Sequence, residues 1–103
     1  MTFKDKINMV TSEFKQAIEA KYNGCSVVLF GSVARGDYSS SSDFDFMVLL
    51  SGTSNREIEE DIYNIAYELE LSHDCTIDVI VLSKDTNMKI PVYQNVFREG
   101  ISI

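Results

Sequence analysis

Hydrophobic residues recur along this chain with two different periods, which predict helices in some segments and strands in others. Between residues 3 and 18 they are spaced three or four apart, as on one face of a helix. Residues 56–71 repeat that spacing, and acidic residues in their first turn favour a helix start. Short apolar runs at 26–30, 44–50 and 76–83 predict buried strands.

Polar residues between these segments predict where the first elements begin and end. Thr2 is placed to cap the first helix, and Asn23-Gly24 offers a left-handed stop behind it. After the first strand, residues 32–35 are long enough for one helical turn. A turn at Gly36-Asp37 then leads into a serine-rich loop.

The end of the sequence predicts one more helix and a short strand. A proline at the start of residues 91–97 can open the helix, and Gly100 would end it. Residues 101–103 are apolar enough to add an edge strand. The complete order of elements predicts a single α/β (α+β) domain over residues 1–103.

Composition narrows the class of protein without defining its chemistry. Hydrophobic residues make up 45% and charged residues 24% of 103 residues, which is ordinary for a folded domain. The net charge of −7 and pI of about 4.5 argue against direct nucleic-acid binding and against a membrane surface. No apolar run is long enough to span a bilayer, and the first ten residues do not resemble a secretory signal. We therefore expect a cytoplasmic protein.

The two cysteines and the single histidine add little functional signal. Cys25 and Cys75 each stand at the start of a predicted strand. The sequence leaves undecided whether the two form a disulfide, but a reduced pair fits the absence of secretory features better. His73 stands alone beside a loop, which is more typical of a surface or capping residue than of a ligand.

Two aspartates interrupt the second predicted strand. Asp43 and Asp45 are two residues apart, so in a strand they would share one face while Phe44 and Phe46 take the other. Carboxylates are poor strand formers and are costly to bury. Placed side by side they repel each other, and a hard cation relieves that repulsion.

A third aspartate interrupts the next strand in a similar way. Asp78 falls on the opposite face from the odd-numbered apolar residues of 77–81. If this strand lies beside the second strand, Asp78 would join Asp43 and Asp45 in a cluster on one sheet face. Such a cluster suits two Mg²⁺ ions and a nucleoside triphosphate, because Mg²⁺ takes its remaining ligands from water and phosphate oxygens.

The end of the first strand offers groups that suit phosphate. Gly31 would let a ligand approach the backbone closely, Ser32 offers a hydroxyl and an amide, and Arg35 offers a positive charge. Each feature taken alone has an ordinary structural explanation, as a turn or a surface residue. Their convergence with three aspartates in so short a chain favours a site.

These residues resemble a known signature. Gly31-Ser32, ten further residues, and then Asp43-x-Asp45 match the GSx10DxD pattern of the polymerase-β-like nucleotidyltransferase superfamily. The blocks GSVARG, SSDFDFMVLL and NVFREGISI are similar to those of the minimal nucleotidyltransferases, and the resemblance covers nearly the whole chain. It implies the polymerase-β-like nucleotidyltransferase fold, a small mixed sheet flanked by helices.

The resemblance also implies roles for individual residues. Asp43 and Asp45 would be metal ligands, and Asp78 would complete the triad as a ligand and an activator of the attacking hydroxyl. Gly31 and Ser32 would hold the triphosphate. Arg35 and Ser42 stand within matching blocks and are the further nucleotide-binding candidates.

Family members of this size commonly act as antitoxins beside a helical HEPN ribonuclease toxin. The activity that the resemblance implies is transfer of AMP from ATP to a tyrosine of that toxin, with Mg²⁺ as cofactor and pyrophosphate as product. Two alternatives stay open. In the first, the chain is an antitoxin that masks its toxin by contact alone. In the second, it is a small-molecule nucleotidyltransferase that works with a helical partner.

Overall fold

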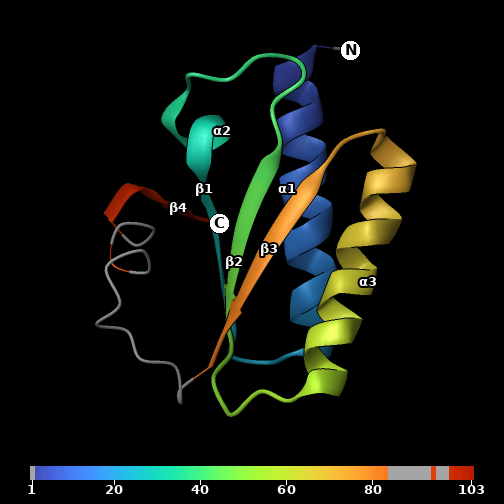
Figure 1. Ribbon diagram of the computed structural model, residues 1–103, viewed down its shortest axis with the longest axis vertical. Coiled ribbons are helices and arrows are strands. Elements are labelled where there is room, and N and C mark those ends of the chain that lie inside the picture. Colours follow the sequence, from blue (N-terminus) through green and yellow to red (C-terminus); the bar gives the residue numbers. More distant parts are fainter. Residues whose placement is uncertain (1, 84–93, 95–97) are drawn as a thin grey trace.

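The computed structural model describes residues 2–83, 94 and 98–103, and it confirms the predicted α/β (α+β) class (Figure 1). A helix opens the chain, two antiparallel strands follow with a short helix between them, and a second long helix leads to a third strand. A two-residue strand lies at the end. The elements are α1 (Phe3–Lys21), β1 (Ser26–Phe30), α2 (Gly31–Arg35), β2 (Phe44–Leu49), α3 (Arg56–His73), β3 (Ile77–Leu82) and β4 (Ile101–Ser102).

The four described strands form one mixed sheet in the order β3-β2-β1-β4. Strands β1 and β2 are antiparallel, and β4 adds to the other edge of β1, also antiparallel. Strands β2 and β3 are parallel, so the chain must cross over between them, and α3 makes that crossing. The mixed sheet that the family resemblance implied is therefore present, as is the predicted edge strand near the C-terminus.

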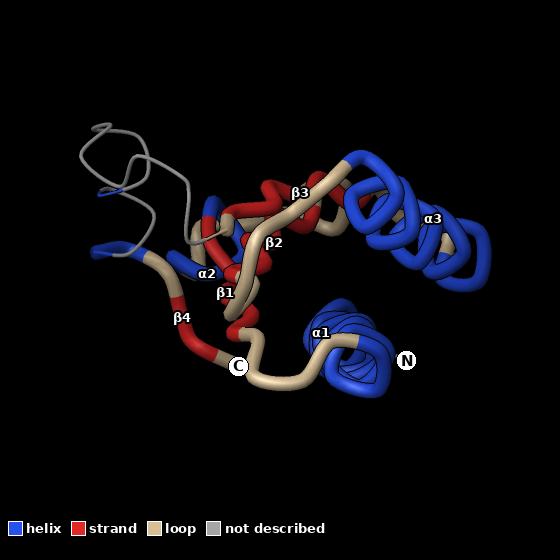
Figure 2. The backbone as a smooth tube through the Cα atoms, turned by 90° about the horizontal axis from the view of Figure 1, so that it is seen from below, coloured by secondary structure: helices blue, strands red, loops and turns tan. Residues whose placement is uncertain are grey.

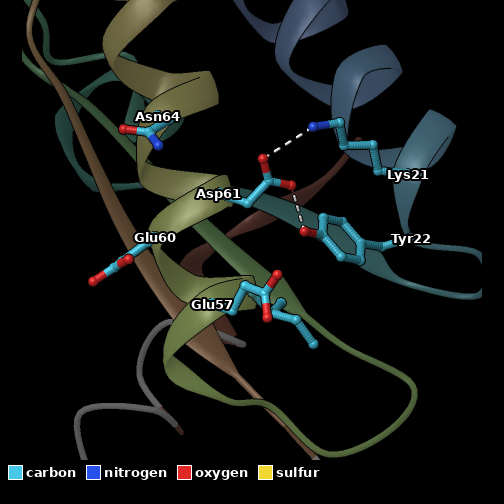
Figure 3. Close-up of a pocket in the computed structure, with 7 residues that line it drawn as sticks. Lys21, Tyr22, Glu57, Glu60, Asp61 and Asn64 are labelled. Carbon is cyan, nitrogen blue, oxygen red and sulfur yellow. Dashed lines mark hydrogen bonds and ion pairs between the residues drawn. The ribbon is translucent and has the colours of Figure 1, made fainter.

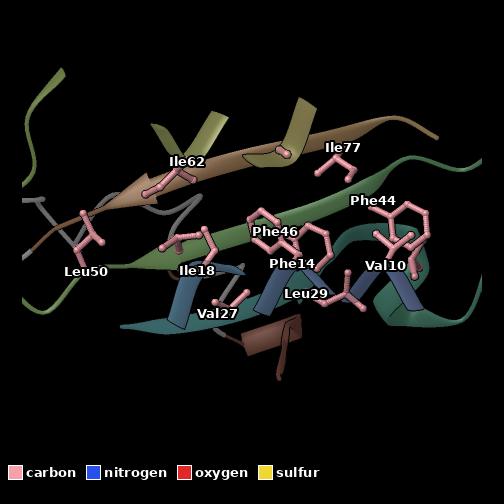
Figure 4. Close-up of a cluster of buried hydrophobic side chains, with 13 residues drawn as sticks. Val10, Phe14, Ile18, Val27, Leu29, Phe44, Phe46, Leu50, Ile62 and Ile77 are labelled. Atoms are coloured by element: carbon pink, nitrogen blue, oxygen red, sulfur yellow. The ribbon is translucent and has the colours of Figure 1, made fainter. Parts of the chain in front are cut away.

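Helices α1 and α3 cover one face of the sheet, where the main core lies (Figures 2 and 4). The ring of Phe14 on α1 stacks on that of Phe46 on β2 with 4.4 Å between centroids, and both side chains are fully buried. Phe44 is buried beside them. The core of this face contains Val10, Phe14, Ile18, Val27, Leu29, Val33, Phe44, Phe46, Val48, Leu50, Ile62, Ala66 and Ile77.

The alternate residues of the same strands point to the other face. Val28, Met47 and Leu82 form a smaller buried cluster there, one residue from each of the three longer strands. This alternation confirms the predicted faces of β2 and β3. It also places Asp45 and Asp78 on this second face, because each alternates with the core residues of its strand and the two are register partners.

The predicted ends of the elements are correct to within two residues. Thr2 caps α1 through a reciprocal pair of bonds with Asp5, and Gly24 is the left-handed residue behind that helix (φ 76°). Helix α3 continues two residues past its predicted end, to His73, because Asp74 supplies the left-handed cap (φ 51°). Strand β2 is one residue shorter than predicted, and β3 is one residue shorter at each end. The predicted helix over 91–97 falls almost entirely outside the described residues.

Both cysteines are free thiols, and burial raises the pKa of each. His73 is mostly buried, and its Nε2 lies 2.5 Å from Glu13 Oε2, so it joins the two long helices. No helix in the described part of the chain is long and apolar enough to cross a membrane. The cytoplasmic location stays a prediction.

Candidate active site

Two of the predicted aspartates lie side by side at one end of the sheet. Asp45 of β2 and Asp78 of β3 are register partners in the parallel pair, so their side chains stand on the same face. Each is the second residue of its strand, and the two strands begin at the same end of the molecule (Figure 1). The prediction that the second and third strands lie side by side is therefore confirmed.

Gly31 packs directly against the carboxylate of Asp45. Phe30 is the register partner of Asp45, and Gly31 follows it with a backbone φ of 76°. A Cβ atom on Gly31 would overlap Asp45 Oδ2 and would stand 3.1 Å from its Cγ. The glycine is thus required twice, for its left-handed backbone and for the space that the carboxylate fills.

Asp43 occupies a different position from the one predicted. Strand β2 begins at Phe44, so Asp43 precedes the strand rather than interrupting it, and its side chain is exposed. The amide of Phe44 donates to the carbonyl of Thr76, so the pairing with β3 starts at Phe44, the first residue of the predicted strand 44–50. Asp43 nevertheless lies near enough to Asp45 to influence its ionisation.

Burial and the neighbouring charges change the pKa of Asp45. Partial burial raises the pKa of Asp45, and the negative charges of Asp78 and then Asp43 raise it further. The guanidinium of Arg35 acts in the opposite direction. Asp45 is therefore held where its negative charge lacks compensation, and a bound cation would stabilise its ionised form.

The donor chemistry of this group fits magnesium. Carboxylate oxygens are the ligands that Mg²⁺ prefers, and it commonly uses one or two of them together with phosphate oxygens and water. Among residues 2–83, 94 and 98–103, no three acidic, histidine or cysteine side chains are already gathered around one point. Asp43 and Asp78 are both exposed. Asp43, Asp45 and Asp78 would therefore hold a metal only jointly with other ligands, such as the oxygens of a triphosphate.

The remaining predicted residues surround this end of the sheet. Ser32 is half-buried in the first turn of α2. Arg35 ends that helix, and its guanidinium lies 3.3 Å from Asp37 and 3.9 Å from Glu99. Arg35 lies near enough to Asp45 to act on its ionisation, and α2 as a whole packs on β1 and β2.

Ser42 organises the loop that leads to Asp43. Its hydroxyl accepts a hydrogen bond from the amide of Ser39 at 2.9 Å, and its amide donates to the carbonyl of Ser39 at 3.1 Å. The loop is thereby closed one residue before the first aspartate. Its role toward nucleotide stays a prediction.

Sequence patterns did not reveal a pocket at the opposite end of the two long helices (Figure 3). It has a volume of about 460 Å³, and the end of α1 and the first turns of α3 line it. Asp61 accepts from Tyr22 Oη at 2.5 Å and pairs with Lys21 Nζ at 2.9 Å. In this region the sequence signals only the acidic first turn of α3, which favours a helix start.

Comparison with known proteins agrees with the fold. The family model for the nucleotidyltransferase domain matches residues 11–102. A protein of Methanocaldococcus jannaschii named "Putative protein adenylyltransferase MJ0604" is 34% identical over 94 residues, which is 85% of this chain and 88% of that protein.

Two solved structures share the fold. One described as a minimal nucleotidyltransferase covers 100% of this chain and 97% of its own, with a TM-score of 0.70 and 21% identity. The other is a toxin–antitoxin crystal structure with AMP-PNP, which covers 88% of this chain and 69% of its own, with a TM-score of 0.68 and 21% identity.

The family match and the archaeal relative define the class of protein. The chain belongs to the nucleotidyltransferase domain family. It is accordingly an enzyme of the nucleotidyltransferase class, and the minimal-nucleotidyltransferase resemblance of its sequence is confirmed.

Proposed function

We propose that this protein is an antitoxin that transfers AMP from ATP to a tyrosine of a HEPN ribonuclease toxin and thereby neutralises it. The observation that carries the proposal is the packing of Gly31 on Asp45 with Asp78 in register beside it. The archaeal relative named as a protein adenylyltransferase supports a protein acceptor. The shared fold with a toxin–antitoxin structure containing AMP-PNP supports the nucleotide and the partner.

In the proposed reaction the tyrosine hydroxyl oxygen attacks the α-phosphorus of ATP. The bond from that phosphorus to the bridging oxygen of the β-phosphate breaks, and pyrophosphate leaves with both electrons. The phenolic proton passes to a carboxylate oxygen of Asp78. Since Asp78 is exposed on β3, a side chain of another protein can reach it.

The other residues of the site hold the nucleotide. Gly31 and Ser32 receive the triphosphate, and Arg35 adds a charge-assisted contact that must displace its weak, exposed pairing with Asp37. Asp43, Asp45 and Asp78 are the residues that would hold Mg²⁺. When bound, that metal neutralises the charge that develops on the phosphate oxygens.

The experiment is label transfer from ATP to the purified toxin in the presence of Mg²⁺. With label on the α-phosphate, we expect the toxin to become labelled on tyrosine and its ribonuclease activity to fall. With label on the γ-phosphate, we expect none on the toxin, because that phosphate leaves in pyrophosphate. Labelling from the γ-phosphate alone would show phosphorylation and contradict the proposal.

One observation favours a second function, in which the toxin is neutralised by contact alone. The net charge of −7 suits a cover for a basic RNA-binding surface. The two functions differ in their need for nucleotide. Toxin inhibited equally with and without ATP, and carrying no label, would establish masking.

A further inference from the structure

Helix α3 carries a row of apolar side chains on its exposed side, which we call the α3 stripe. It consists of Tyr63, Tyr67 and Leu71, and their exposed fractions are 48%, 50% and 71%. Spacings of four residues place them on successive turns of one side of the helix. The core side of α3 is occupied by Ile62 and Ala66 instead. Single exposed apolar residues are normal, but an aligned row makes a patch of the kind found at protein interfaces.

Acidic side chains border the α3 stripe. Glu60 and Glu68 are exposed on the same helix, three residues before Tyr63 and Leu71 respectively. The first turn contains one positive charge, Arg56, and it already pairs with Glu60 at 2.9 Å. The surface therefore suits a partner with an apolar centre and basic residues around it. Tyrosine side chains fit such a place, because they combine a large apolar ring with a polar tip.

The α3 stripe runs toward the candidate active site. Leu71 lies in the last turn of α3, and Glu70 beside it accepts a hydrogen bond from the amide of Ile77 at 2.8 Å. Asp78 is the next residue along β3, which is an edge strand of the described sheet. Figure 1 shows this end of α3 beside the beginning of β3. Asp78 stands on the sheet face opposite α3, so a protein lying along the stripe would reach its carboxylate around the edge strand β3.

We propose that the α3 stripe is the docking surface for the protein whose tyrosine is modified, and that this partner meets it with a basic, apolar-centred surface. The inference rests on the proposed function. Docking along α3 would hold the acceptor protein, while the chemistry stays at the end of the sheet. Separate surfaces for docking and transfer predict variants that lose the partner but keep the nucleotide.

The test compares binding of the purified HEPN toxin to single variants of the full chain by calorimetry. Leu71→Ser and Tyr67→Ser are each expected to weaken toxin binding about tenfold or more, as at the centre of an interface. Met9→Ser is the matched control, because Met9 is 40% exposed on α1. Glu68→Lys is also expected to weaken toxin binding, most strongly at low salt. Glu19→Lys on α1, which makes the same change in net charge, is not expected to weaken it. ATP binding should change less than twofold in all of these variants.

The outcomes separate the docking surface from the proposed function. Variants with unchanged toxin affinity and unchanged label transfer would overturn the docking proposal alone. A wild-type protein that binds toxin but transfers no label would overturn the transfer reaction, and the variants would still test the surface. A wild-type protein that dimerises, and that Leu71→Ser makes monomeric with undiminished toxin binding, would assign the stripe to a second copy instead. A wild-type protein that neither binds nor labels toxin would contradict both proposals.

Discussion

At the scale of single residues, the contact between Gly31 and Asp45 is the most specific feature of the site. In Gly31→Ala the new Cβ would overlap Asp45 Oδ2, on a backbone with a φ of 76°. We expect the left-handed backbone to cost about 1–2 kcal/mol of stability. Displacement of the carboxylate by about 1 Å should lower nucleotidyl transfer on the order of 100-fold. Urea unfolding and initial transfer rates measure the two effects.

Gly36→Ala is the matched control for that substitution. Gly36 also has a left-handed backbone, with a φ of 84°, but a Cβ there would meet nothing within 4 Å. We expect a similar loss of stability and little loss of transfer. Equal loss of transfer in both variants would mean that backbone strain, and not the position of Asp45, controls the reaction.

The raised pKa of Asp45 predicts how stability depends on pH. A carboxyl group whose pKa is raised by folding favours the folded state while it is protonated, below its unfolded pKa of about 3.9. That contribution disappears as the pH rises through the folded pKa. Asp45→Asn should therefore be more stable than the wild type at pH 7 without metal, and the gap should shrink toward pH 4. Urea unfolding of both proteins from pH 4 to 8 measures it, and a gap that widens toward pH 4 would contradict the assignment.

At the scale of elements, the bonds of Asp61 join the end of α1 to the start of α3. Tyr22→Phe removes the hydroxyl that donates to Asp61 at 2.5 Å, while Lys21 keeps its contact. A hydrogen bond to a charged group at a half-buried position is worth about 1–2 kcal/mol. We expect that loss in the free energy of unfolding at pH 7. Tyr63→Phe, at an exposed tyrosine, should change it by less than about 0.5 kcal/mol.

The same contact predicts behaviour at high pH. Burial and the Asp61 carboxylate raise the pKa of Tyr22 to about 12. The stability that Tyr22 contributes is then fully present below pH 10, the unfolded pKa, and is lost as the pH rises toward 12. Absorbance titration of the tyrosines should show one late group that is missing in Tyr22→Phe. Titration of all tyrosines near pH 10 would exclude the contact.

Much of the arrangement of these elements could be predicted from the sequence. Apolar residues three and four apart predict α1 and α3, because buried helix faces need that spacing. Alternation of apolar and polar residues predicts the faces of β2 and β3. The alternation also placed Asp45 and Asp78 together. The start of β2 at Phe44 could be predicted as well, whereas the exposure of the Asp43 side chain could not, because the strand pattern does not extend to the residue before it.

Contacts between distant segments explain the other features that were not predicted. Gly31 was expected to make room for a ligand, whereas part of that room is filled by Asp45. The pair of Tyr22 and Asp61 joins residues 39 positions apart, and no local pattern signals it. Positions in one element predict which face a side chain takes, but not which distant residue it meets.

At the scale of the whole molecule, the excess of negative charge makes metal and nucleotide binding interdependent. The net charge of −7 opposes ATP, and a cation at the aspartates would remove part of that repulsion. Mg²⁺ with ATP at 100 times the dissociation constant should stabilise the protein by about 2.7 kcal/mol and raise its melting temperature by roughly 10–20 °C. ATP with a chelator should have much less effect. Equal shifts with and without Mg²⁺ would show that nucleotide binding does not need the metal.

The measurement that tests the central claim most directly is label transfer from α-labelled ATP to the toxin by the wild type, Asp45→Asn and Asp74→Asn. Asp74 is exposed near the same end of the sheet, and asparagine tolerates its left-handed backbone, so it provides a matched loss of one charge. We predict labelled tyrosine with the wild type and Asp74→Asn, and a loss of at least about 100-fold with Asp45→Asn. Undiminished transfer by Asp45→Asn would contradict the account, because the reaction would then not depend on the carboxylate at its centre.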